Sequence, residues 1–592
     1  MLQDTDLLSI QEVRTKVERA YEAYLRFRSF TQDQVDAIVE AMAAAARAQA
    51  RPLAEMAVEE TGMGTVEGKL AKNLLCADLL PRHIRGMKTI GVIRTAREEG
   101  IIEIAEPVGV VAAILPTTNP TSTAIYKSVI SLKSGNGVVL TPHPRAKRCT
   151  CATIDILLQA ALRAGAPEGI IQCINHPTLE ATNALMRHPR TGVILSTGGG
   201  GIVKAAYSSG KPAYGVGPGN VPVLIDESAD VSDAVRKVVA GKSFDYGTVC
   251  SSEQTIVAVR SLREKILHEL KAANAFLCTR EQGEALARVL LTERLGVSPE
   301  CVGQSPQKIA RMAGFEAPAN ASILAVEIAG VGRQHPLSAE KLSPVLALHF
   351  VDSFGAAVDA CETILHLNGL GHTCVIYSTD DARVLEYGRR MPAFRVLVNT
   401  PSPQGATGIT TNVQPSMTLG CGAIAGNITS DNVGPQHLLN IKRIAYEVRS
   451  AEQAFSVPSA AVDRGTVVSA VERYLAARGI DVGSAAQPPS VAAQVVDRFL
   501  GARRAPAVAA ASPTCACDVP AAAVAPPPPA PVEAPKPAPV PEIPISDFVC
   551  ENDVRQAIRE SRKIFIGPKS IVTPSARDLG AQYDVLVVAK RP

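Results

Sequence analysis

The stretch Gly192-Val193-Ile194-Leu195-Ser196-Thr197-Gly198-Gly199-Gly200-Gly201-Ile202-Val203-Lys204 joins a short apolar strand, through a glycine-rich turn, to the start of a helix. Glycines in such a turn allow the backbone to approach a phosphate group closely at the positive end of the helix. Because the spacing differs from the usual dinucleotide-binding fingerprint, a flexible turn is the alternative interpretation. The strand–turn–helix order itself is one unit of an α/β fold.

The same alternation continues on both sides of this stretch. Further strand candidates lie at 101–115, 138–140, 221–225, 255–259, 322–326, 373–377 and 395–399. Helix-like segments such as 150–165 separate them, and this order predicts mostly parallel sheets in two α/β lobes. Residues from about 9 to 78 are predicted to be helical, with Ser9 as a candidate helix cap.

Length and composition narrow the class of protein. A chain of 592 residues is too long for one ordinary core, so two or three domains are expected. A net charge of +3 without a basic stripe argues against a nucleic-acid partner. The 13 cysteines show no dense pairing pattern, and the N-terminus lacks the features of a signal peptide, which favours reduced cysteines in a cytosol. No apolar run approaches the roughly 20 residues that span a bilayer, so no membrane segment is expected.

The composition changes sharply near residue 479. Residues 505–544 are rich in alanine and proline, and such a segment favours polyproline II and predicts a semi-rigid linker. Amphipathic helices are predicted on either side of it, at 490–500 and 546–561, and two short strands follow the second. Each helix could dock in the groove of a partner or fold back on its own subunit, or the tail could be a solubilising appendage. Cys515 and Cys517 have no further ligands nearby, so no metal site is expected.

Cys250 is a candidate nucleophile. It follows the small residues of Gly247-Thr248-Val249 and precedes Ser251-Ser252. A thiolate attacks carbonyl carbons readily, and backbone N–H groups in a tight approach could stabilise the product. The alternative is strong when the residue is considered alone, because a single cysteine is usually a small buried apolar residue.

Three other segments carry polar groups that suit a reaction site. Asn119 lies between an apolar strand and a helix, and its two amide donors suit an oxyanion, although an Asn-Pro turn is the simpler interpretation. Residues 214–220 form a glycine-rich loop before a strand. Glu340, in the segment 340–345, could hold ribose hydroxyls, but an isolated glutamate is more often a solvated surface charge.

Together these segments, in this order, resemble the aldehyde dehydrogenase superfamily, and more narrowly the CoA-acylating aldehyde dehydrogenases of bacterial microcompartments. The resemblance covers about residues 10 to 450. Several motifs recur in sequence, which makes the resemblance far more specific than any one of them. The matching stretches are 181–211, 215–223, 244–254, 340–345, 368–373 and 419–422.

The resemblance implies an α/β fold with a Rossmann-type cofactor domain, an α/β catalytic domain and a small oligomerisation element. The expected divisions are N-terminal helices and NAD-binding domain at 1–240, with about 100–112 contributing to oligomerisation, catalytic domain at 241–415, remainder of the core at 416–480, linker with a short helix at 481–545, and docking segment at 546–592. A homo-oligomer, either dimer or tetramer, is implied as well.

The resemblance also implies roles for single residues. Cys250 falls at the family's nucleophile, and Asn119 falls at the oxyanion amide, with the Cys250 backbone N–H as the second donor. His372 is either the proton acceptor for the incoming CoA thiol or a structural histidine. The residues expected to bind NAD are Thr117, Pro142, Gly198, Gly199, Gly201, Gly217 and Glu340.

Two departures from the hydrolytic members of the family are informative. Gly215 occupies the place where those enzymes have a glutamate that activates water, so a thioester here is expected to survive until CoA attacks it. Thr141 stands where they usually have a lysine that contacts the adenosine ribose, which leaves NAD and NADP both open. The expected reaction is a short aldehyde, propanal or acetaldehyde, with CoA and NAD⁺ giving acyl-CoA and NADH through a thiohemiacetal and a thioester.

The C-terminal segment resembles, over short stretches, the elements that package enzymes into bacterial microcompartments. The expected location is therefore the bacterial cytoplasm, in the lumen of a microcompartment, with shell proteins or co-packaged enzymes as partners. Three alternatives stay open: a hydrolytic aldehyde dehydrogenase, a relative that reduces an acyl phosphate, and a scaffold without catalysis.

Overall fold

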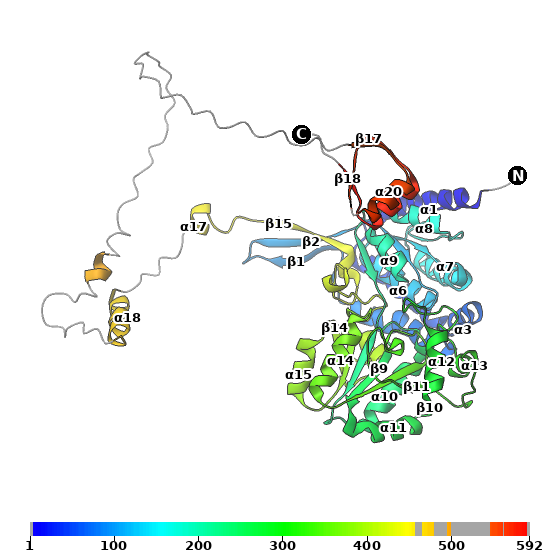
Figure 1. Ribbon diagram of the computed structural model, residues 1–592. Coiled ribbons are helices and arrows are strands. Elements are labelled where there is room, and N and C mark those ends of the chain that lie inside the picture. The colour runs from blue at the N-terminus through cyan, green and yellow to red at the C-terminus, as the bar shows by residue number, and fades with distance from the viewer. Residues whose placement is uncertain (1–3, 456–463, 479–493, 499–544, 561, 589–592) are drawn as a thin grey trace, which may run out of the picture. The chain divides into compact units, whose positions relative to one another are not determined.

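The computed structural model describes residues 4–455, 464–478, 494–498, 545–560 and 562–588. The chain divides into two compact units, Met1–Val457 and Pro458–Pro592. Each unit is described by itself (Figure 1).

A run of helices opens the first unit. Asp4 caps α1 by accepting from the backbone N–H groups of Asp6 and Leu7. The cap expected at Ser9 is wrong, because Ser9 lies inside α1, where its buried hydroxyl bonds to Thr178. The helices of this run are α1 (Thr5–Phe27), α2 (Gln32–Ala48), α3 (Ala50–Thr61), α4 (Val66–Leu74) and α5 (Leu80–Ile84), with the π-helical turn η1 (Leu75–Leu79) before α5.

A five-stranded parallel sheet has the order β5-β4-β3-β6-β7. Its strands are β3 (Val110–Ile114), β4 (Gly137–Thr141), β5 (Ile171–Cys173), β6 (Thr191–Thr197) and β7 (Ala213–Val216). Each residue of β3 and β4 is buried, as expected where helices cover both faces of a parallel sheet. Apolar clusters place α1, α8 (Leu179–Arg187) and α9 (Gly200–Tyr207) on one face and α2, α6 (Pro120–Lys133) and α7 (Lys147–Arg163) on the other.

A seven-stranded parallel sheet has the order β10-β11-β12-β9-β8-β13-β14. Its strands are β8 (Val221–Ile225), β9 (Glu253–Val259), β10 (Ala275–Cys278), β11 (Ile323–Glu327), β12 (Val345–Val351), β13 (Gly371–Tyr377) and β14 (Ala393–Val398). The two predicted α/β lobes are confirmed. Because β8 already belongs to this sheet, the sheets divide between β7 and β8, ahead of the expected domain boundary at 240.

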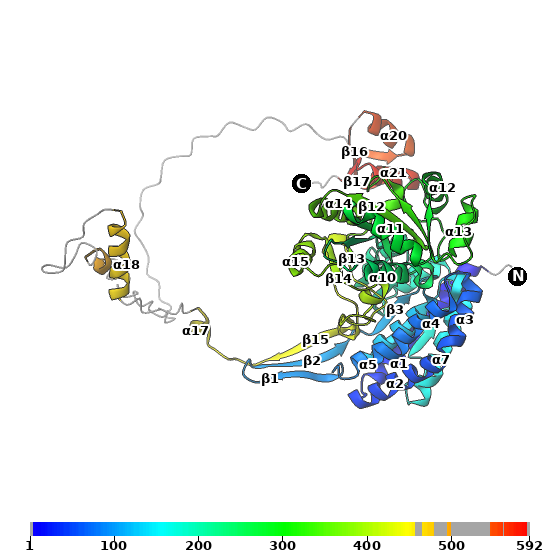
Figure 2. The ribbon, with the colours of Figure 1, turned by 90° about the horizontal axis from the view of Figure 1, so that it is seen from below.

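A three-stranded antiparallel sheet projects from the rest of the first unit (Figures 1 and 2). It pairs β1 (Gly91–Ala96), β2 (Ile101–Pro107) and β15 (Leu439–Ala445), so it joins two segments that are far apart in the sequence. Ile441 and Ile444 on β15 are exposed. The sheet contains most of the segment 100–112 that was expected to take part in oligomerisation.

The second unit contains a small βαβαβ fold. Its strands β16 (Ile545–Val549), β17 (Ile564–Val572) and β18 (Leu586–Val588) form a parallel sheet, and α20 (Glu551–Arg559) and α21 (Pro574–Gln582) connect them. The helix expected at 546–561 therefore begins only at Glu551. Its apolar residues Val554 and Ala557 pack in the core of this unit, which removes the free apolar face on which the docking argument depended.

The remaining expectations for the tail fall largely on residues that the structure does not describe. Of the helix expected at 490–500, residues 494–498 are described and are helical, and the predicted linker at 505–544 lies outside the described residues. A further helix, α18, spans Arg464–Ala476. Within the described ranges, no helix is long and apolar enough to cross a membrane. The same ranges hold no group of three or more side chains suited to bind a metal.

Candidate active site

A cavity of about 750 Å³ opens where residues from the ends of the two parallel sheets meet. In the five-stranded sheet the chain runs outward from β3 to β5, then returns to the other side of β3 for β6, so the topology switches between β3 and β6. Ligands bind α/β sheets at such a switch point, beyond the carboxyl ends of the strands. Every residue predicted from the sequence to bind or react lines this cavity, apart from His372: Thr117, Asn119, Pro142, Gly198, Gly199, Gly201, Gly217, Cys250 and Glu340.

Cys250 lies between the short helix η3 (Phe244–Gly247) and β9. Its Sγ is 3.2 Å from Nε2 of His372, and Nδ1 of His372 is 2.9 Å from the hydroxyl of Thr373 at the start of β13. Gly219 makes this arrangement possible. A Cβ at position 219 would lie 2.1 Å from the carbonyl oxygen of Cys250 and 3.1 Å from the His372 ring.

Burial sets the protonation of this pair. Burial, with a smaller contribution from the nearby Glu340 carboxyl, raises the pKa of the Cys250 thiol to about 12. Burial also lowers the pKa of His372 to about 3. At neutral pH the pair is therefore a thiol beside a neutral imidazole, whose Nε2 lies within hydrogen-bond reach of the thiol proton.

Arg395 is linked to His372 through the hydroxyl of Thr373, and it was not predicted from the sequence. Its buried guanidinium donates to the carbonyl oxygens of Gly371 (3.3 Å) and Gly420 (2.6 Å) and to the hydroxyl of Thr373 (3.3 Å). The sequence does hold one indication of its role, which is that an arginine interrupts the apolar residues of β14. Arginines are rarely buried unless they are paired.

Asn119 precedes Pro120, the first residue of α6. Its Nδ2 donates to the hydroxyl of Thr118 at 3.1 Å, and its Oδ1 accepts from Nζ of Lys72 at 2.5 Å. One of the two amide hydrogens is therefore occupied by Thr118. The other is left for a group in the cavity, which Asn119 lines.

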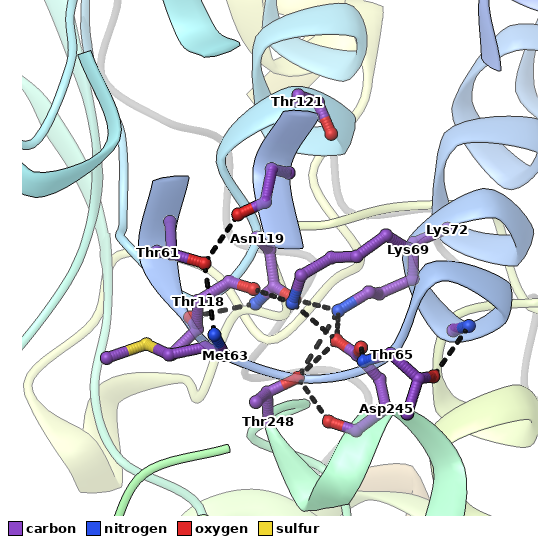
Figure 3. A network of polar contacts seen from close by, with 12 residues as sticks. Thr61, Met63, Thr65, Lys69, Lys72, Thr118, Asn119, Thr121, Asp245 and Thr248 are labelled. Carbon is purple, nitrogen blue, oxygen red and sulfur yellow. Dashed lines mark hydrogen bonds and ion pairs between the residues drawn. The ribbon is translucent and has the colours of Figure 1, made fainter. Parts of the chain in front are cut away.

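A buried charge cluster lies behind Asn119 (Figure 3). It consists of Lys69 and Lys72 on α4 and of Asp245 in η3, and the side chains are no more than 2 % exposed. Both lysines pair with the Asp245 carboxylate. Burial opposes its ionisation, but Lys72 and Lys69 hold the pKa of Asp245 below its usual value. Burial lowers the pKa of Lys72 to about 7, although Asp245 opposes this change. These residues were not predicted from the sequence, where their charges are typical of a solvated surface.

The wall around the glycine turn suits a ligand rich in oxygen atoms. The turn residues Gly198–Gly201 connect β6 to α9 and line the cavity. The hydroxyls of Thr141 and Thr197, also in the wall, are buried and have no hydrogen-bond partner among the described residues. Buried hydroxyls normally have a partner, so a bound ligand would satisfy them. These features fit a dinucleotide.

Glu340 is the one carboxylate among the described residues that line the cavity. Its Oε1 accepts from the backbone N–H of Gly219 at 3.2 Å, and burial raises the pKa of Glu340 to about 8. At neutral pH the group is mostly protonated, which makes it a poor base for activating water.

Gly215 does not line the cavity. Its carbonyl oxygen accepts from the hydroxyl of Tyr207 at 3.0 Å, and a Cβ at position 215 would lie 2.7 Å from a methyl group of Val203. Position 215 therefore faces α9 in this conformation. The lack of a base for water therefore follows from the residues that do line the cavity, and not from Gly215 alone as expected.

Comparisons with known proteins agree with this geometry. The model of the aldehyde dehydrogenase family matches residues 2–285. The bifunctional aldehyde-alcohol dehydrogenase AdhE of Escherichia coli K12 is 46% identical over 442 residues, which are 74% of this chain and 50% of that protein. The chain thus spans about half the length of the first curated relatives that it matches.

Two solved structures cover the corresponding part of the chain. The acetylating aldehyde dehydrogenase from Geobacillus thermoglucosidasius is 49% identical with a TM-score of 0.75, and the match covers 76% of this chain and 99% of that one. The propionaldehyde dehydrogenase of Rhodopseudomonas palustris, solved with bound propionyl-CoA, is 29% identical with a TM-score of 0.68, and the match covers 73% and 94% of the two chains.

Proposed function

The chain belongs to the acylating branch of the aldehyde dehydrogenase family, and from this premise we propose that it converts a short aldehyde, CoA and NAD⁺ into acyl-CoA, NADH and a proton. The proposal depends chiefly on the contact between Cys250 and His372. Among the described residues that line the cavity, Glu340 has the one carboxyl group, and its raised pKa makes it a poor base. The relative solved with propionyl-CoA and the acetylating relative make propanal and acetaldehyde the first substrates to test.

The first step is an attack by the Cys250 sulfur on the aldehyde carbonyl carbon. The thiol passes its proton to Nε2 of the neutral His372 as the carbon–sulfur bond forms, so no free thiolate has to persist in the buried site. The carbonyl oxygen becomes an oxyanion, and the free amide hydrogen of Asn119 and the backbone N–H of Cys250 stabilise it. The product is a thiohemiacetal on Cys250.

The cofactor would lie along the other end of the cavity. Gly198–Gly201 would hold its phosphates at the start of α9, Thr117, Pro142 and Gly217 would line its path, and Glu340 would contact its ribose. When bound, NAD supplies the hydride acceptor that converts the thiohemiacetal into a thioester. The residues do not discriminate NAD from NADP.

The thioester is then transferred to CoA. His372 first releases to solvent the proton that it took from Cys250. It then takes the proton of the CoA thiol as the CoA sulfur attacks the acyl carbon, Asn119 holds the second oxyanion, and the bond to the Cys250 sulfur breaks. His372 returns a proton to the leaving sulfur, which restores the resting thiol. Water competes poorly because Glu340, mostly protonated at neutral pH, cannot activate it efficiently.

We expect NADH formation to depend on CoA. With acetaldehyde or propanal and NAD⁺ but no CoA, NADH should stop at no more than one equivalent per active site, because the thioester persists. With CoA, turnover should continue and mass spectrometry should detect acyl-CoA.

A CoA analogue without the thiol is the matched control, since it occupies the site but cannot accept the acyl group. Continuous NADH production with release of free acid and no CoA would instead identify a hydrolytic enzyme. Activity with an acyl phosphate and NADH would identify a biosynthetic reductase, and no activity in any assay would favour the scaffold.

The proposal also assigns the second unit to packaging. The cavity and the catalytic residues lie within Met1–Val457. Pro458–Pro592 has its own small core and contains a segment rich in alanine and proline. We place the enzyme in the bacterial cytoplasm, inside a microcompartment, with a shell protein or a co-packaged enzyme as the partner. The projecting sheet of β1, β2 and β15 would join subunits of a dimer or tetramer.

A variant ending at residue 457 should retain its kcat and its thermal unfolding midpoint, because it keeps every contact of the first unit. It should lose sedimentation with microcompartment particles when both forms are expressed beside a shell. A variant that lacks only residues 545–592 separates the folded part of the tail from the segment rich in alanine and proline. Loss of activity on truncation would show that the second unit belongs to the catalytic fold.

A further inference from the structure

The charge cluster of Lys69, Lys72 and Asp245 is buried and well connected by hydrogen bonds, but it has no role in the steps above. Nζ of Lys72 contacts three groups at once: the carboxylate of Asp245, the amide oxygen of Asn119, and the hydroxyl of Thr248 at 3.3 Å. Figure 3 shows Lys72 and Lys69 extending from α4 toward Asp245, with Asn119 beside them. The cluster thus joins α4 to the loop of Asn119 and to the loop that leads to Cys250.

We propose that Lys72 is a positioning residue, which fixes the orientation of the Asn119 amide and strengthens it as a donor to the oxyanion. The inference rests on the proposed function, because Asn119 is the oxyanion donor there. The ammonium group of a lysine donates hydrogen bonds and cannot accept them. The amide atom that Lys72 contacts must therefore be the oxygen. The amide NH₂ is thereby directed toward Thr118 and the cavity.

In its ammonium form, which the Asp245 carboxylate favours against the effect of burial, Lys72 also acts on the same amide through its charge. A cation bonded to the amide oxygen draws electron density from the nitrogen, and the N–H group opposite becomes a stronger donor. This effect is largest where water is excluded, and Lys72 and Asn119 are both buried. The Asp245 carboxylate holds the ammonium group in place.

The backbone around Asp245 places its carboxylate beside the two lysines. Asp245 and the next residue, Tyr246, both have a positive φ, 47° and 51°, which residues other than glycine rarely adopt. Gly64 and Gly68 leave the room for it, since a Cβ at either position would lie 2.0 or 2.5 Å from the Asp245 side chain. The carboxylate also accepts from the backbone N–H of Thr65 at 2.8 Å. Strained backbone of this kind is concentrated at functional sites.

Lys69 provides a matched comparison on the same helix. It is equally buried, and its Nζ donates to the same carboxylate at 2.7 Å. Its other bond, however, goes to the backbone oxygen of Thr118 at 2.7 Å and not to the amide of Asn119. Losing Lys69 therefore removes a charge from the cluster but leaves the amide with its partner.

The test measures acylation of Cys250 by p-nitrophenyl acetate. This activated ester forms an oxyanion in the same place, and the burst of p-nitrophenolate needs neither NAD nor CoA. The rate of the burst is compared for wild type, Lys72→Met, Lys69→Met, Asn119→Ala and the double variant Lys72→Met/Asn119→Ala, with unfolding midpoints as a check of the fold. Lys72→Gln, which keeps an N–H donor without the charge, replaces Lys72→Met if that variant does not fold.

Lys72→Met should slow the burst by about tenfold or more, since removing an oxyanion donor outright costs about 10²–10³ in rate. Lys69→Met should have a clearly smaller effect. The double variant should react at the rate of Asn119→Ala, because Lys72 acts through that amide. Equal slowing by Lys72→Met in the presence and absence of Asn119 would overturn the inference, and so would a wild-type protein without a burst. If the burst responds as expected while wild type makes no NADH, the inference stands and the proposed function fails.

Discussion

Cys250→Ser should abolish NADH formation, with a fall in kcat of about 10⁴-fold or more, the range seen when a catalytic nucleophile is removed. The hydroxyl is similar in size to the thiol, so the cavity keeps its shape. It gives up its proton far less readily, however, and His372 is a weak base because burial lowers its pKa to about 3. The measurement is the steady-state rise in NADH absorbance with propanal, NAD⁺ and CoA.

Cys278→Ser is the control for this variant. Cys278 is partly exposed like Cys250, but it lies in β10 and does not line the cavity. Its substitution should leave the rate unchanged. Trypsin digestion after incubation with aldehyde and NAD⁺ should locate the acyl group on Cys250 in wild type. Turnover by Cys250→Ser near the wild-type rate would assign the nucleophile to another group.

The fold could be predicted where the pattern of apolar residues is long enough. Strands such as β3, β4 and β8 are continuous apolar runs because both faces of the sheets are covered. β5 and β10, with three and four residues, are too short for a period to appear. The segment 546–561 was wrongly expected to be one helix, because a strand followed by a helix can mimic a single helical pattern over so few residues.

The candidate site could be predicted only in its cavity-lining residues. Loops that follow parallel strands converge at the same edge of a sheet, so Asn119 and Gly198 could be expected to meet. Asp245 and Lys72 are 173 residues apart in the chain, and nothing in the sequence around either one predicts their pairing. Burial of their charges depends on contacts between α4 and η3, which arise only in the folded chain.

Asn119→Ala should lower kcat by about 10²–10³-fold and change KM little, because the amide bonds to the oxygen mainly once it carries negative charge. The loss should appear with both propanal and acetaldehyde, since the carbonyl oxygen is common to them. Steady-state kinetics at saturating NAD⁺ and CoA measure the two constants. A rise in KM at constant kcat would mean that Asn119 binds the ground state of the aldehyde and does not stabilise the oxyanion.

Asn119→Asp separates the donor from the shape of the side chain. Aspartate has the size of asparagine and still accepts from Lys72, so the charge cluster and the start of α6 should stay intact. It offers no N–H group to the cavity, and its negative charge repels the developing oxyanion. The Asp variant should therefore be at least as slow as the Ala variant. Activity close to wild type in Asn119→Asp would show that the oxyanion is held by backbone groups alone, and that the amide of Asn119 serves only to begin α6.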